Sequence, residues 1–120
     1  MGAGGSINGP VTISAGGALY VNAGTIGGPL RSTGATALTL CAAQVSGPLT
    51  ITGTSGPVLI GGPQCAGNNI SGPAQITRNT GGVSFAGNTV HGPLTITGNT
   101  GGFSYSGNTA DGPITVSGNS

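Results

Sequence analysis

The stretch that decides the fold runs from Val90 to Thr109 and reads VHGPLTITGNTGGFSYSGNT. It divides into two similar halves of about ten residues, and each half is a short run of β-forming residues followed by Gly-Asn-Thr. In the first half Val90, Leu94 and Ile96 fall on one parity, while the threonines fall on the other. That period of two is the pattern of a strand with one buried face.

The same pattern recurs along the whole chain. Gly-Pro pairs stand 20 residues apart at 72–73, 92–93 and 112–113, and the earlier pairs at 9–10, 28–29 and 47–48 are separated by 19, 19 and then 25 residues. The units therefore begin near 7, 26, 45, 70, 90 and 110, within one domain over 1–120. The 25-residue interval indicates an irregular insertion near residues 54–65.

These repeats predict an all-β fold, a parallel β-solenoid (β-helix). We expect about six coils of about 20 residues, with two short strands per coil and Gly-Asn-Thr corners, because a single unit cannot bury its apolar stripe and stacked units can. Helix is excluded by Gly or Pro at every few residues. An antiparallel sandwich or meander is the alternative, since Gly-Asn is also a hairpin signal, but hairpins do not require identical residues every 20 positions.

The corner asparagines fall in two registers. Asparagine tolerates the left-handed conformation that tight turns require, and stacked identical amides can also hydrogen-bond along the axis. Both interpretations stay open at this stage. The candidate ladder residues are Asn79, Asn99 and Asn119 in one register, and Asn88 and Asn108 in the other.

The two cysteines, Cys41 and Cys65, stand 24 residues apart, near the same place in successive coils. Strands about 4.8 Å apart are compatible with disulfide geometry, and a disulfide would imply an oxidising compartment. Two small, buried thiols are the alternative.

Charge excludes several functions. The charged residues are Arg31, Arg78 and Asp111, with no Lys and no Glu. A lone carboxylate cannot form a general acid–base pair, a net charge of +1 gives no nucleic-acid footprint, and no apolar run reaches the roughly 18 residues of a membrane span. We therefore expect no enzyme, no metal or other cofactor, no nucleic-acid partner and no membrane insertion. Ser71, His91 and Asp111 share a register and match a catalytic triad in residue type only, since nothing supplies an oxyanion hole.

In the first half of each repeat, the alternate residues that face outward form a hydroxyl-rich face. Hydroxyls within a pair should lie about 6.7 Å apart, and those on successive coils about 4.8 Å apart. The expected face is Thr12, Ser14, Thr33, Thr50, Thr52, Thr77, Thr95, Thr97, Thr115 and Ser117. It is similar to the ice-binding face of β-solenoid antifreeze proteins, which implies that ordered hydroxyls and methyls hold ice-like water. Arg31 and Gln75 interrupt it, and Thr is also simply a favourable exposed strand residue.

The repeat also resembles Gly-Asn-Thr repeat proteins predicted from actinobacterial genomes. The shared pattern is SGNTxxGPxTxxGNTGG, which is followed from residue 69 onward and more loosely before it. The resemblance implies a solenoid in an extracellular or cell-surface setting, and it brings no activity with it. Residues 1–6 carry neither the basic nor the apolar region of a signal peptide.

The ends of the chain suggest assembly. The final unit stops half a coil short at Ser120, and no charged residue guards either end against strand pairing. We expect a non-enzymatic structural protein that is its own partner and stacks end to end into filaments or a surface layer, each copy adding about 29 Å. The alternatives are an ice-binding protein, and a fragment of a longer solenoid whose missing coils cover the ends.

Overall fold

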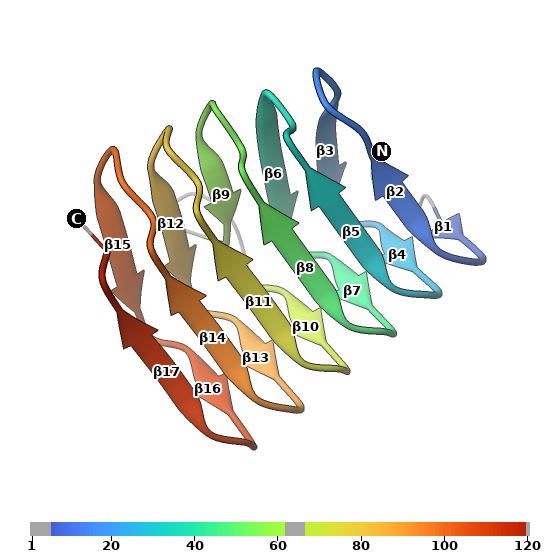
Figure 1. The fold of residues 1–120 in the computed structure, drawn as a ribbon. Helices are drawn as coiled ribbons and strands as arrows, with labels where there is room; N and C mark the ends of the chain where they lie inside the picture. The colour runs from blue at the N-terminus through green and yellow to red at the C-terminus, as the bar shows by residue number, and fades with distance from the viewer. Residues whose placement is uncertain (1–5, 62–66, 120) are drawn as a thin grey trace.

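A computed structural model describes residues 6–61 and 67–119 and shows a β-solenoid (Figure 1). All seventeen strands of the described residues belong to three parallel sheets, and successive strands of each sheet come from successive coils. The all-β, parallel solenoid predicted from the repeat is confirmed.

The three sheets follow one another in every coil. Sheet A holds β1 (Ser6–Ile7), β4 (Thr25–Ile26), β7 (Gln44–Val45), β10 (Asn69–Ile70), β13 (Thr89–Val90) and β16 (Thr109–Ala110). Sheet B holds β2 (Val11–Ile13), β5 (Leu30–Thr33), β8 (Leu49–Thr52), β11 (Ala74–Thr77), β14 (Leu94–Thr97) and β17 (Ile114–Ser117). Sheet C holds β3 (Ala18–Asn22), β6 (Ala37–Cys41), β9 (Val58–Ile60), β12 (Val83–Ala86) and β15 (Phe103–Ser106).

The expectation of two strands per coil is wrong, because the Gly-Pro bend divides the first half-repeat into two strands. In the fifth coil, for example, β13 ends at Val90 and β14 begins at Leu94, with a bend between them. The glycine of that bend has a steric role, since a Cβ on Gly92 would lie 3.0 Å from the backbone nitrogen of Pro73 in the coil before. The same approach at Gly112 would be 2.7 Å, to the nitrogen of Pro93. Only glycine lets successive bends stack this closely.

Register follows the 19-, 25- and 20-residue spacing of the repeats. Leu30 pairs with Leu49, Leu49 with Ala74, and Ala74 with Leu94. The described residues therefore make five complete turns and, with β16 and β17, begin a sixth.

The third coil holds the additional residues. Val58 pairs with Val83 and Ile60 with Phe85, so residues 58–60 belong to the regular coil rather than to an insertion. Residues 54–57 of the predicted insertion precede β9, and the N–H of Thr54 bonds to Asn79 of the next coil. Residues 62–66, which follow β9, lie outside the described residues.

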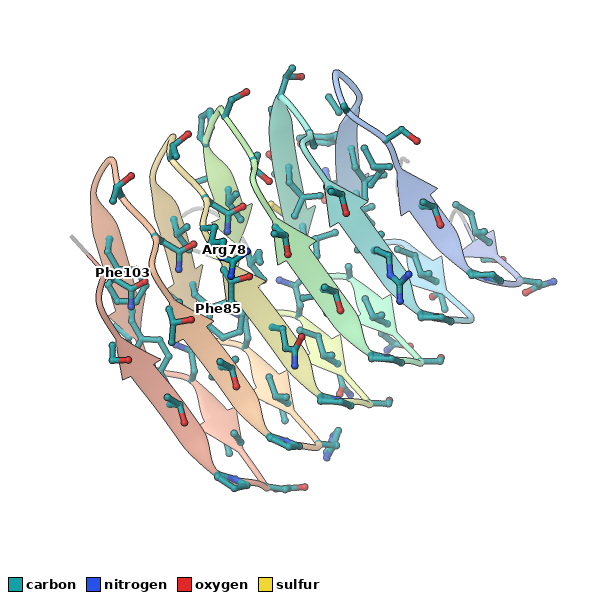
Figure 2. The ribbon with its side chains drawn as sticks, viewed as in Figure 1. Arg78, Phe85 and Phe103 are labelled. Carbon is teal, nitrogen blue, oxygen red and sulfur yellow. The ribbon has the colours of Figure 1, made fainter. Side chains whose placement is uncertain are left out.

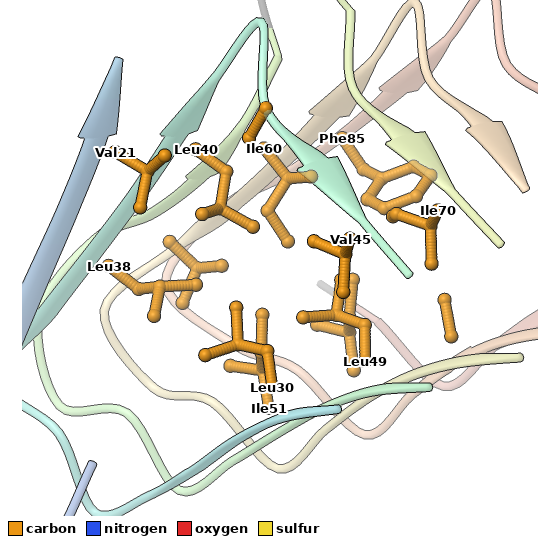
Figure 3. Packing of buried hydrophobic residues seen from close by; sticks show 14 of the residues in the cluster. Val21, Leu30, Leu38, Leu40, Val45, Leu49, Ile51, Ile60, Ile70 and Phe85 are labelled. Carbon is orange, nitrogen blue, oxygen red and sulfur yellow. The ribbon is translucent and has the colours of Figure 1, made fainter. Parts of the chain in front are cut away.

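The core lies between the three sheets and consists of the inward parity of each strand. Ile26, Leu30, Leu38, Ile51 and Phe85 are among its fully buried side chains, and Figure 3 shows residues of all three sheets meeting at the centre. One inward position departs from the pattern: Ser32 stands between Ile13 and Ile51 in a column of aliphatic residues, and its buried hydroxyl has no hydrogen-bond partner. The alternation of the sequence thus sets which side chains are buried.

Candidate functional site

The outward face of sheet B forms two columns of mainly hydroxyl side chains, which point toward the viewer in Figure 2. Strand register places the members of each column on adjacent strands, one coil apart. The first column is Thr12, Arg31, Thr50, Gln75, Thr95 and Thr115. The second is Thr33, Thr52, Thr77, Thr97 and Ser117. Ser14 comes directly after β2, on the same parity as Thr12, and is exposed.

The two columns differ in regularity. Arg31 and Gln75 interrupt the first column, whereas the second contains only Thr and Ser. In the second column the hydroxyl oxygens of Thr52 and Thr77 lie 3.3 Å apart, within hydrogen-bond distance. Thr97 and its neighbour Thr95 are half-buried. This arrangement offers a repeating hydroxyl lattice.

Two further columns consist of asparagine side chains at the corners of the coil. The columns are Asn79–Asn99–Asn119 and Asn68–Asn88–Asn108, which we call the two asparagine ladders. In each ladder, the Nδ2 of one amide donates to the Oδ1 of the amide in the next coil, over 2.7–3.0 Å. The stacked amides therefore do more than shape the turn: they connect successive coils.

Asn99 shows how each buried amide is satisfied. Its Oδ1 accepts hydrogen bonds from both the backbone N–H and the Nδ2 of Asn79, at 3.0 and 2.8 Å. Its Nδ2 donates to Oδ1 of Asn119 at 2.7 Å and to the backbone carbonyl of Ile76 at 3.0 Å. The side chain is fully buried. A buried amide with all of these bonds made is stabilising, whereas the loss of one partner would leave polar groups unsatisfied in a low-dielectric interior.

Asn68 belongs to a ladder although the sequence-based prediction did not include it. Its Nδ2 donates to Oδ1 of Asn88 and to the carbonyl of Leu40. The signal was present in the Gly67-Asn68 pair, which stands 20 residues before Gly87-Asn88. It was obscured because Asn69, rather than Thr, follows.

The first ladder begins at Asn79 in the fourth coil. Thr54 occupies the equivalent position of the third coil. The backbone N–H of Thr54 donates to Oδ1 of Asn79 at 2.9 Å. The threonine hydroxyl cannot continue the ladder, and its buried oxygen has no hydrogen-bond partner. The first ladder therefore does not extend into the third coil, because Thr54 stands where an asparagine could continue it.

The residue before most ladder positions is held in the left-handed conformation. Glycine fills that position in several coils, including Gly98 and Gly118, both with φ of 67°. Arg78, Ala23 and Ala42 adopt the same conformation with φ between 52° and 57°. A residue with a Cβ pays about 1 kcal/mol for this conformation, so the corner geometry is imposed by the stacking and not by the local sequence.

The predicted disulfide falls partly outside the described residues. Cys41 ends β6 and is 6% exposed. Its expected partner, Cys65, lies outside the described residues, so the pairing stays a prediction.

His91 and Asp111 are brought together by the stacking. His91 Nδ1 and Asp111 Oδ2 lie 3.0 Å apart, with 45% and 65% of the two side chains exposed. Ser71 precedes them by one coil, since Ile70 pairs with Val90. Exposed pairs of this kind contribute little to stability, and the described residues contain no group of three His, Cys, Asp or Glu side chains that could hold a metal ion.

The fold and these surfaces define the protein as a β-solenoid. A comparison of the chain with protein families, with curated proteins and with solved structures found no match. Over residues 6–61 and 67–119, the structure has no helix that is long and apolar enough to cross a membrane.

The ladder interactions predict a large cost for Asn99→Ala. The substitution removes the acceptor for the backbone N–H and for one Nδ2 bond of Asn79, and the donor to the carbonyl of Ile76, all in the interior, so we expect the free energy of unfolding to fall by about 3 kcal/mol. Thermal or denaturant unfolding measures the change. Asn69→Ala is the matched control, because Asn69 is exposed and its replacement should cost less than about 0.5 kcal/mol. Equal losses of unfolding free energy in the two variants would contradict a stabilising role for the ladder.

Lengthening a ladder should stabilise the protein. In Thr54→Asn, the new amide can donate to Oδ1 of Asn79 and to the carbonyl of Ser32, and it can accept from the N–H of Ala35. We expect about 1 kcal/mol of added stability, measured by the same unfolding experiment. Thr100→Asn, at an exposed corner position, is the control and should leave stability unchanged. A loss of stability in Thr54→Asn would show that the third coil cannot accommodate the amide.

Proposed function

We propose that this protein is a non-enzymatic structural solenoid that associates with further copies through the edges of its sheets. The observation that supports this most directly is the exposure of β17, the outermost strand of sheet B among the described residues. Its inward residues Ile114 and Val116 are 48% and 36% exposed, whereas the equivalent Leu94 and Ile96 of β14 are fully buried. A parallel strand placed against β17 would bury both.

A second copy could provide that strand. The opposite edge of sheet B is β2, whose residues have the same alternation as β17 and the same strand direction. In a head-to-tail stack Ile114 would meet Val11 of the next copy, and Val116 would meet Ile13. Because every strand pairing among the described residues is parallel, such a junction would repeat the contact between neighbouring coils in sheets A and B and could propagate into a filament.

Charge offers little resistance to this association. Natural edge strands are often protected by lysine or by charged residues that point inward. None of the residues of β1, β2, β3, β15, β16 and β17 is charged. We propose an extracellular or cell-surface setting for the assembly, on the strength of the resemblance to actinobacterial Gly-Asn-Thr repeat proteins and the predicted disulfide.

Edge association is tested by Val116→Lys. The substitution places a charge on the inward side of the edge strand, so we expect the assemblies larger than a dimer, which the unmodified protein forms as its concentration rises, to be absent from sedimentation profiles of the variant. Gln75→Lys is the control, because Gln75 is exposed in the middle of sheet B, far from both edges. Negative-stain images should show filaments in the unmodified protein and in Gln75→Lys, but not in Val116→Lys. A monomeric unmodified protein at high concentration would discard the proposal.

A second function, binding to ice, is supported by the register of the threonine face. Ice binding requires hydroxyls and methyls at regular spacing on a flat surface, and sheet B presents two aligned columns with about 4.8 Å between coils. The half-buried state of Thr50, Thr52, Thr77, Thr95 and Thr97 restricts their movement.

Thermal hysteresis and ice shaping test this second function. The double variant Thr95→Lys/Thr97→Lys disrupts both columns, so we expect any activity of the unmodified protein to be lost. Ser84→Lys is the control, since Ser84 lies on the outer face of sheet C and its replacement should leave the activity unchanged. An absence of activity in the soluble unmodified protein would exclude ice binding.

A further inference from the structure

The outer face of sheet C differs from that of sheet B in its side chains. Strand register forms one central column of Tyr20, Thr39, Leu59, Ser84 and Ser104. Tyr20 and Leu59 are among the few exposed large apolar side chains of the described residues, at 57% and 42%. The large side chains therefore stand in the first and third coils of the column, and the small ones in the fourth and fifth.

A shallow groove lies on the same face beside the small residues. It has a volume of about 290 Å³, and its lining includes Leu59, Gly82, Ser84, Gly102 and Ser104. Gly82 and Gly102 take φ of 97° and 107° just before β12 and β15, and they leave the face without side chains at these points. The groove starts at Leu59 and follows the C-terminal half of the sheet.

We propose that a second copy of the chain packs face to face on sheet C, related by a two-fold axis that passes close to Leu59. In the central column Tyr20 stands two coils before Leu59, and Ser104 stands two coils after it. The two-fold therefore places Tyr20 of each copy against Ser104 and the adjoining groove of the other. Tyr20 of each copy and the groove beside Ser104 of the other would thus fit together at two equivalent places, as an isologous interface requires.

The intermediate positions fit the same arrangement. Thr39 stands one coil before Leu59 and would meet Ser84 of the other copy, so both lateral contacts join a larger side chain to a smaller one. Leu59 would meet Leu59 at the axis and supply an apolar centre. Sheets that pack face to face lie about 10 Å apart, a separation that these side chains can fill together.

Charge and area indicate the strength of the pairing. None of the residues in β3, β6, β9, β12 and β15 is charged, so two copies of the face do not repel each other. Five strands at about 4.8 Å and about five residues at 3.3 Å give a flat area of roughly 400 Å² per copy. Two copies would together bury about 800 Å², which is below the size of stable specific interfaces and within the range of weak encounters, and we therefore assign a weak dimer that forms at high concentration. This pairing is lateral and does not depend on the end-to-end association proposed above.

Cysteine cross-linking tests the two-fold directly, in a Val116→Lys background that suppresses edge association. Tyr20→Cys and Ser104→Cys variants are mixed and oxidised with oxidised glutathione. We expect a covalent heterodimer at several times the yield of cross-linked dimer from either variant alone. In the two-fold arrangement Tyr20 and its own copy lie about 19 Å apart along the face, too far for a disulfide. Equal yields from the mixture and from the single variants would overturn the proposal.

Sedimentation equilibrium in the same background provides an independent measurement. Ser104→Lys places a charged side chain where Tyr20 of the other copy would insert, and we expect the dissociation constant to rise at least tenfold. Gln75→Lys adds the same charge to sheet B and should leave it unchanged. An equal effect of both variants, or no dimer at any concentration, would overturn the proposal. Conversion of larger assemblies into dimers by Val116→Lys alone would bear on the edge contacts and not on this face.

Discussion

Every coil of this solenoid is held by hydrogen bonds to its neighbours rather than by bonds within itself. The N–H of Leu30 donates to the carbonyl of Pro48, that of Leu49 to Pro73, and that of Leu94 to Pro113. An isolated coil would lose nearly all of its backbone partners and would have no core. Stability therefore depends on register, because each side chain lies about 4.8 Å from its counterpart in the next coil and must tolerate that counterpart.

This constraint explains which polar residues the interior accepts. A carboxylate or an ammonium group stacked on its own copy would repel it, whereas an amide has both donors and acceptors and can bond to an identical amide. The ladders of Asn79–Asn99–Asn119 and Asn68–Asn88–Asn108 use that property. The near absence of charge in the composition and the repetition of asparagine thus have the same physical origin.

The stacking also determines the kind of surface that the protein offers. Outward positions repeat at the spacing of the coils, so the faces are extended columns: a hydroxyl lattice on sheet B, and on sheet C a column with Tyr20 at one end, Leu59 in the middle and small residues at the other end. Among the described residues, the hydrogen-bonded side chains of His91 and Asp111 stand exposed at a bend. Recognition by surfaces of this kind depends on a match of shape and period, which favours ordered or repeating partners over small substrates.

The sequence by itself determined the length of the coil, the parity of the buried side chains and most of the ladder positions, because these properties repeat and a repeat is visible without coordinates. The tertiary structure decided the rest. It showed three strands per coil, since the bend at Gly92 depends on contact with Pro73 in the coil before. It also brought Asn68 into a ladder and left the hydroxyls of Ser32 and Thr54 without partners. Each of these features depends on what the neighbouring coil places opposite a residue, and the residue's own unit does not contain that information.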